Sequence, residues 1–439
     1  MVELTGWDQD ILFLQYGERF KRFRVLLQRA LNKRAALDYI PMQQHEIRRF
    51  MHRLVQAPEK FVDHVHLMAA SIAIGVSYGY KTESIKDYYV KVAEGSMVAL
   101  ADLMSPGKWA VDICPPLRYL PTWIPFFKFH QHAKFVRRLK NVAETEPFEY
   151  ALERIVGATA EVSFTSKLLI ESNGQLAGEE SREDIQNLAA GLYGAGSDTI
   201  AAGVKSFFLA MTLYPNAQTK AQAEISDYLQ RQQRMILPSD RASLPYTSAL
   251  VRELLRWHPI TNLVAHQSNQ EDCSVALGDK TYRIPAHSIV VANVWRMMHD
   301  PAVYPEPDRF VPERYLVDNP PPGPENYAFG FGRRICPGLH VAQNSLWIIL
   351  SNIIVNFDIL KAKDARGMEI TPEESYTDGS SAAICVLDHP KGWLRRMVVG
   401  LLRVWLDMRT SNDHVMHGMA DVANGEAALC LSLCTVMEP

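Results

Sequence analysis

Apolar and polar positions follow a helical period through most of residues 1–260. In segments 19–37 and 42–55, apolar residues recur every three or four positions among many arginines, which is the spacing of one buried helix face. A longer stretch of the same kind covers residues 181–214, and Pro215 ends it because proline has no N–H to continue the ladder. The first part of the chain is therefore predicted to be helical.

The pattern changes later in the chain. Segments 281–285 and 288–292 carry β-branched residues on either side of a Pro-Ala-His turn, which predicts two short strands. Segment 339–350 returns to a helical pattern. Helices first and short strands later, without a regular strand–helix alternation, predict a mostly α fold with small β-sheets, the α+β class.

Composition and charge exclude several functions. A hydrophobic fraction of 47% over 439 residues supports a large core, and the net charge of -3 argues against nucleic acid as a partner. The six cysteines form no C-x-x-C pair, which favours a reduced compartment and individual roles over disulfides. No apolar run reaches the roughly 18 residues of a spanning helix, so we expect no membrane crossing by the chain as given.

The candidate chemistry begins at residues 329–338, which spell F-x-x-G-x-R-x-C-x-G. Cys336 stands on a glycine-rich turn just before the helical segment 339–350, where amide N–H groups, the helix dipole and nearby cations stabilise a thiolate. Such a thiolate is a soft ligand for iron, and the glycines let a flat macrocycle approach the backbone. The alternative is a buried structural cysteine in a turn. The spaced positions are Phe329, Gly332, Arg334, Cys336 and Gly338.

This run resembles the haem-binding loop of the cytochrome P450 family, whose cysteine thiolate pushes electron density onto the iron to favour O–O cleavage. The resemblance implies haem b as the cofactor and Cys336 as its axial iron ligand. It also implies the P450 fold for about residues 1–379.

A second motif, A-G-S-D-T, lies within the predicted helix 181–214. Ala195 and Thr199 are four residues apart and share a face, with Gly196 beside them, so a notch for a diatomic ligand is predicted there. The Thr199 hydroxyl can bond back to the helix or outward to that ligand, and Asp198 supplies an acid. The alternative is a small-residue face for helix packing. The motif resembles the family's oxygen-activating A-G-x-D/E-T segment, which implies that Asp198 and Thr199 deliver protons.

A third motif is Glu253-Leu-Leu-Arg256, whose charges share one helix face. Alone it is an ordinary surface ion pair. The family joins such a helix to an arginine in a downstream P-E-R-F segment, here Pro-Glu-Arg314-Tyr. The resemblance implies a buried structural triad of Glu253, Arg256 and Arg314, costly to break.

Groups that could hold the haem propionates complete the predicted site. Arg334 comes from the cysteine loop, and Arg24 lies on a segment that resembles the family's W-x-x-x-R helix, with Phe20 at the tryptophan position. His266 stands where the family often places a propionate-contacting histidine; the alternative is a satisfied loop residue.

The resemblance implies a haem-thiolate monooxygenase that inserts one atom of O2 into a small apolar organic substrate, similar to fungal secondary-metabolism members. Its role would be in secondary metabolism or in the oxidation of xenobiotics. Electrons would come from NADPH through a flavoprotein, NADPH–cytochrome P450 reductase, with Arg333 as a candidate contact. Two alternatives remain: a truncated, non-catalytic paralogue, and a haem-thiolate isomerase or dehydratase that needs no external electrons.

The ends of the chain depart from the family pattern. Residues 1–379 are predicted to form the catalytic domain without the N-terminal anchor and first sheet strands, and residues 380–439 an atypical tail. The intact family sits on the endoplasmic reticulum. This chain is expected in the cytosol or in peripheral membrane contact, through the proline-rich segment 121–125 and an apolar stripe over residues 394–405.

Overall fold

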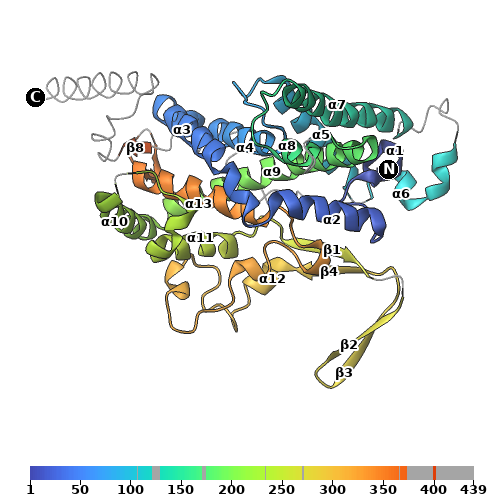
Figure 1. The fold of residues 1–439 in the computed structure, drawn as a ribbon. Coiled ribbons are helices and arrows are strands. Elements are labelled where there is room, and N and C mark those ends of the chain that lie inside the picture. Colours follow the sequence, from blue (N-terminus) through green and yellow to red (C-terminus); the bar gives the residue numbers. More distant parts are fainter. Residues whose placement is uncertain are drawn as a thin grey trace, which may run out of the picture.

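The computed structural model describes residues 1–105, 107–120, 129–170, 175–232, 234–268, 271–364, 366–372 and 399–401. Helices dominate it (Figure 1). The longer ones are α2 (Glu18–Leu31), α3 (Ile40–Gln56), α4 (Phe61–Tyr78), α5 (Tyr88–Leu103), α7 (Phe129–Val156), α9 (Glu179–Leu213), α10 (Pro215–Gln232), α11 (Pro245–Trp257) and α13 (Leu339–Asn356). The short ones are α1 (Val2–Thr5), α6 (Ala110–Ile113), α8 (Phe164–Leu169) and α12 (Val294–Met298).

The strands form small antiparallel pairs. In the order of pairing they are β1 (Leu263–Gln267) with β4 (Ile289–Asn293), β2 (Cys273–Leu277) with β3 (Lys280–Ile284), β5 (Phe357–Ile359) with β8 (Val399–Leu401), and β6 (Ala362–Lys363) with β7 (Glu369–Ile370). Figure 1 shows the β2–β3 hairpin projecting away from the helices. The predicted fold class, mostly α with small sheets, is confirmed.

Helix α9 runs through the middle of the molecule, with α4 packed along it (Figure 1). α4 is almost entirely buried because most of its positions are apolar or small. The segment Pro58–Tyr78 has mean hydropathy 1.2 and is long enough to cross a membrane, but 78% of its apolar window is buried inside the protein. Burial on all sides is what a core helix of a globular protein shows.

One predicted boundary needs correction. The segment expected to be helical to residue 37 ends at Leu31, because the Asn32 side chain accepts hydrogen bonds from the backbone N–H groups of Arg34 and Ala35 and turns the chain. Both strands predicted around the Pro-Ala-His turn are present, as β3 and β4; β3 pairs with β2, and β4 pairs with β1. The predicted segment 121–125 and the predicted tail 380–439, with its 394–405 stripe, lie outside the described residues, apart from β8.

Candidate active site

The cysteine loop is shaped by two glycines with left-handed backbone. Gly330 has φ 76° and Gly332 has φ 57°, values that a side chain disfavours. The turn closes where the Cys336 N–H donates to the Phe329 carbonyl at 2.8 Å. A Cβ on Gly338 would lie 3.8 Å from the Cys336 Sγ, and α13 begins at the next residue. The five motif residues therefore place one sulfur at the N-terminus of a buried helix.

The electrostatics of Cys336 differ from the sequence-based expectation. The backbone amides of Gly338 and Leu339 and the positive charge of Arg24 all act to lower its pKa, as expected at such a junction. Burial outweighs them, so the pKa of the free thiol is raised. The fold alone thus leaves the sulfur protonated, and a bound metal cation would be needed to hold it as thiolate.

Helix α2 brings Arg24 to this loop from far away in the sequence. The Arg24 guanidinium donates to the Ile335 carbonyl, next to the cysteine, at 2.8 Å. Burial lowers the Arg24 pKa. α2 is tied to α9 on its other side, where the Arg22 Nε donates to the buried carboxylate of Asp184 at 2.5 Å. This tie fixes the helix that presents Arg24.

Arg334 occupies the same region. Its guanidinium lies 4.3 Å from the ring centroid of Phe20 and donates to the carbonyls of Ile11, at 3.2 Å, and Leu14. Its pKa is lowered by burial and by the charge of Arg24. The His266 pKa is lowered by burial and by Arg334, so all three predicted propionate contacts lie near one another.

These groups fit an anionic cofactor. Among the described residues, neither Arg24 nor Arg334 forms an ion pair with a carboxylate, and the buried Nε2 of His266 has no hydrogen-bond partner. Half-buried cations without counter-ions are unfavourable unless a ligand supplies the negative charge. Two carboxylates beside a cysteine ligand would supply it, as the propionates of haem do.

On α9, the Thr199 side chain turns back to its own helix, and Gly196 faces the neighbouring helix α4. The Thr199 hydroxyl donates to the Ala195 carbonyl one turn earlier at 2.8 Å. A Cβ at Gly196 would lie 3.3 Å from the Cβ of Ala73 on α4. The glycine thus permits the close approach of α4 and α9, which is the helix-packing role given above as the alternative to a ligand notch. Adjacent helix positions are about 100° apart, which is why Gly196 faces another neighbour.

Sequence analysis did not find the group opposite Asp198. Removal from solvent raises the pKa of Glu94, on α5, and the negative charge of Asp198 raises it further. A neighbouring negative charge favours the protonated form of the Glu94 carboxyl group. No local motif marks Glu94, because helix α5 meets α9 only in the folded chain.

The triad is fully buried. Glu253 accepts two hydrogen bonds from Arg256, at 2.8 and 2.9 Å, and its carboxylate lies 3.0 Å from the Nε of Arg314. The Val311 N–H donates to the same carboxylate at 2.9 Å. Arg256 also donates to the carbonyls of three residues before and inside the segment that leads to Arg314: Met298, Pro307 and Arg309. One carboxylate therefore ties α11 to the chain that precedes the cysteine loop.

The chain matches the family model described as Cytochrome P450 over residues 2–378. It is 37% identical to cytochrome P450 monooxygenase COX2 of Coprinopsis cinerea over 376 residues, which cover 84% of this chain and 70% of that protein. It is 36% identical to cytochrome P450 monooxygenase claR of Ampulloclitocybe clavipes over 396 residues, 89% of this chain and 71% of that protein.

Solved structures agree in fold. A zebra fish cytochrome P450 solved with progesterone superposes with a TM-score of 0.69 at 18% identity, covering 91% of this chain and 86% of that one. A second, solved with abiraterone, gives a TM-score of 0.64, also at 18% identity, over 87% of this chain and 84% of that one.

Proposed function

This chain belongs to the cytochrome P450 family, and from that premise we propose how its own residues serve a haem-thiolate monooxygenase. Proteins of this family bind haem and catalyse oxygenation, so the chain is a monooxygenase. Haem, when bound, supplies reductive O2 activation, which no amino-acid side chain provides. The observation that supports the residue assignments best is the cluster of Arg24, Arg334 and His266 around the Cys336 loop.

Each residue would have a distinct task. Cys336 would bind the iron through Sγ, and the glycine turn before it leaves room for a flat ring. Arg24 and Arg334 would neutralise the propionates, with His266 as a further donor. On α9, Thr199 would release its hydroxyl from the Ala195 carbonyl and serve as the proton donor at the haem site, and Asp198 would resupply the proton to Thr199.

We expect the Thr199→Ala variant to keep its haem but to lose the coupling between NADPH oxidation and oxygenation of the substrate. Without the hydroxyl, proton delivery slows, and electrons from NADPH leave as hydrogen peroxide. Loss of one positioned proton donor typically lowers the productive rate by about 10²-fold or more. Peroxide released per NADPH consumed measures it directly.

Thr212→Ala is the matched control, because the Thr212 hydroxyl makes the same bond, to the Phe208 carbonyl at 2.8 Å, farther along the same helix. Equal coupling in the Thr199 and Thr212 variants would rule out the proton-delivery role.

We expect the Arg24→Gln variant to hold haem about tenfold less tightly, because a charge-assisted hydrogen bond to a propionate is lost. The haem-to-protein ratio after gel filtration and the rate of haem transfer to apomyoglobin measure it. Arg29→Gln, an exposed position on the same helix, is the control. Arg24→Lys should restore part of the retention. Equal haem transfer from the Arg24 and Arg29 variants would exclude Arg24 as an anchor.

The substrate class and partners follow from this assignment. We propose a small, mainly apolar organic substrate in fungal secondary metabolism, as fits the similarity to fungal monooxygenases. An NADPH-dependent flavoprotein reductase would dock on the cysteine side, where exposed Arg333 stacks 4.0 Å from the Tyr16 ring centroid. The family is generally membrane-associated, and we propose the surface of the endoplasmic reticulum as the location.

The two rival interpretations fare differently. A haem-thiolate isomerase or dehydratase needs no proton delivery to oxygen, and the hydrogen-bonded Thr199 beside Asp198 argues against it. A non-catalytic paralogue would not need unpaired cations around Cys336, yet Arg24 and Arg334 form no ion pair within the described part of the chain. A carbon monoxide difference spectrum of the recombinant protein tests both the haem and its thiolate ligand.

A further inference from the structure

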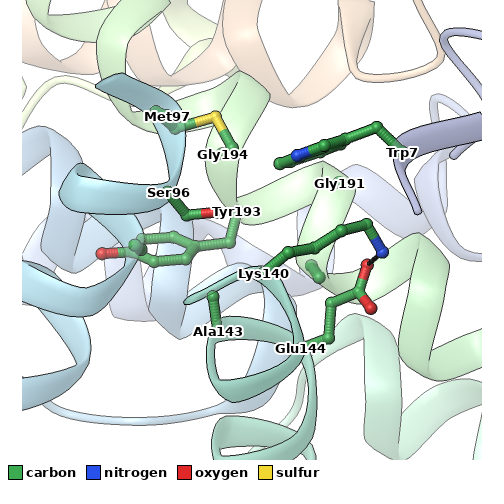
Figure 2. Close-up of a pocket in the computed structure, with 11 residues that line it drawn as sticks. Trp7, Ser96, Met97, Lys140, Ala143, Glu144, Gly191, Tyr193 and Gly194 are labelled. Atoms are coloured by element: carbon green, nitrogen blue, oxygen red, sulfur yellow. Dashed lines mark hydrogen bonds and ion pairs between the residues drawn. The ribbon is translucent and has the colours of Figure 1, made fainter. Parts of the chain in front are cut away.

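A small cavity lies between α5, α7, α9 and the segment before α2 (Figure 2). Its volume is about 20 Å3. A cavity needs roughly 10–15 Å3 to hold one water molecule, so this one has room for a single oxygen-sized group and not for a ring.

The cavity contains a hydrogen-bond donor without an acceptor. Trp7 is 5% exposed, lines the cavity, and its indole Nε1 has no hydrogen-bond partner. Buried donors are normally satisfied, so an orphan N–H beside a cavity points to an acceptor that the protein itself does not supply. Figure 2 shows the indole across the cavity from Tyr193 and above the Lys140 side chain.

The surrounding charges restrict what that acceptor can be. Lys140 forms an ion pair with Glu144 one turn later on α7, and both side chains are buried, at 6% and 14% exposure. The Lys140 ammonium lies 5.4 Å from the Trp7 ring centroid. Asp10, 5% exposed, adds a second carboxyl group. Burial raises the pKa of both Asp10 and Glu144. The one ammonium that lines the cavity is already paired with Glu144, so it is not available to an anionic ligand, whereas a neutral oxygen needs only the indole N–H.

Two glycines of α9 line the cavity and place it on a definite side of that helix. A Cβ at Gly191 would lie 3.0 Å from the Asp10 Oδ2, and one at Gly194 would lie 2.6 Å from the Met97 sulfur, so Asp10 and Met97 pack against α9 more closely than a side chain at either position would allow. Gly191 and Gly194 share a helix face with Ala195 and Thr199, at offsets of three, four and eight residues. At 1.5 Å per residue, the cavity is about 6 Å from Ala195 and about 12 Å from Thr199 along that face.

We propose that this cavity is a substrate subsite, in which Trp7 Nε1 donates to a neutral oxygen, a hydroxyl or carbonyl group, of an otherwise apolar substrate. The subsite rests on the proposed function, since it deepens the substrate class of the same site. It predicts a substrate that already carries one oxygen about 6–12 Å from the carbon to be oxidised. The reaction that supplies the substrate is then itself one that leaves a hydroxyl or carbonyl group.

The test compares dodecanol, dodecane and dodecanoate as probes. Equilibrium dialysis with the haem-loaded protein gives a dissociation constant for each without turnover. We expect Trp7→Phe to weaken dodecanol binding about tenfold, which corresponds to about 1.4 kcal/mol, and to leave dodecane unchanged. Dodecanoate should bind more weakly than dodecanol to the unmodified protein. Trp109→Phe is the matched control, because Trp109 is also partly buried near this segment but already donates to the Asp102 carbonyl at 3.2 Å.

Gly191→Ala provides a second, independent variant, since its Cβ would crowd the cavity wall beside Asp10. It should reproduce the selective loss of dodecanol while raising helix propensity. An unchanged dodecanol affinity in both variants, equal losses for dodecanol and dodecane, tighter binding of dodecanoate, or no binding of dodecanol at all would overturn the subsite. A normal carbon monoxide spectrum alongside any of these results would leave the monooxygenase function standing.

Discussion

The Cys336→Ala variant should lose the thiolate-type Soret band of its reduced carbon monoxide complex completely. The sulfur of Cys336 is the only described cysteine sulfur at a helix N-terminus beside Arg24; Cys114 is exposed and Cys273 lies on β2. Alanine removes the ligand and leaves the glycine turn able to form, because the turn depends on Gly330 and Gly332. The measurement is the carbon monoxide difference spectrum, together with the haem-to-protein ratio.

The environment of the sulfur sharpens this prediction. Burial raises the pKa of the free thiol despite two backbone amides and Arg24. A neutral thiol is a poor ligand, so the thiolate must be stabilised by the iron itself, and other residues cannot readily replace it. Cys273→Ala, on the exposed hairpin, should keep the full band. A thiolate band that persists in Cys336→Ala would mean that another group binds the iron.

A structural feature could be predicted from the sequence when the residues that determine it lie close together in the chain. The cysteine loop occupies ten consecutive residues, and its glycine and cysteine roles can be recognised from spacing alone. The end of α2 was missed because Asn32 competes through its side chain with the apolar period. The pairing of β3 with β2 is local, because a two-residue turn at Gly278-Asp279 joins them and Gly278 has φ 57°, whereas the pairing of β4 with β1 joins segments that are more than twenty residues apart.

The same distinction explains the site residues. Glycine at position 196 is visible in the sequence, but its direction toward Ala73 is not, because it depends on which helix packs alongside α9. The proposed oxygen subsite has no sequence signature at all. Trp7 lies before α2 and meets Lys140 and Glu144 of α7 only in the folded chain, and a Lys–Glu pair four residues apart usually marks a solvated helix surface.

The second large effect is expected from Glu253→Ala, which should abolish the soluble, haem-loaded protein at growth temperature. The side chains of Glu253 and Arg256 are fully buried, and the Arg314 side chain is 7% exposed. Removing the carboxylate leaves two buried guanidiniums without their common anion and the Val311 N–H without its acceptor. Loss of one partner from a buried ion pair costs about 3–5 kcal/mol, against a typical total stability of about 5–15 kcal/mol.

The other hydrogen bonds of Arg256 increase the loss of stability, because they keep its guanidinium buried after the carboxylate is removed. Arg256 is held by the carbonyls of Met298 and Pro307, so it cannot turn to solvent when its anion is removed. Urea unfolding of any soluble fraction would quantify the destabilisation, and Glu253→Gln would retain the shape without the charge. Glu18→Ala is the control, since Glu18 pairs with Lys21 at the same three-residue spacing on the exposed surface and should leave the midpoint unchanged. A soluble Glu253→Ala protein with normal haem content and an unchanged midpoint would show that the triad does not stabilise the fold around the cysteine loop.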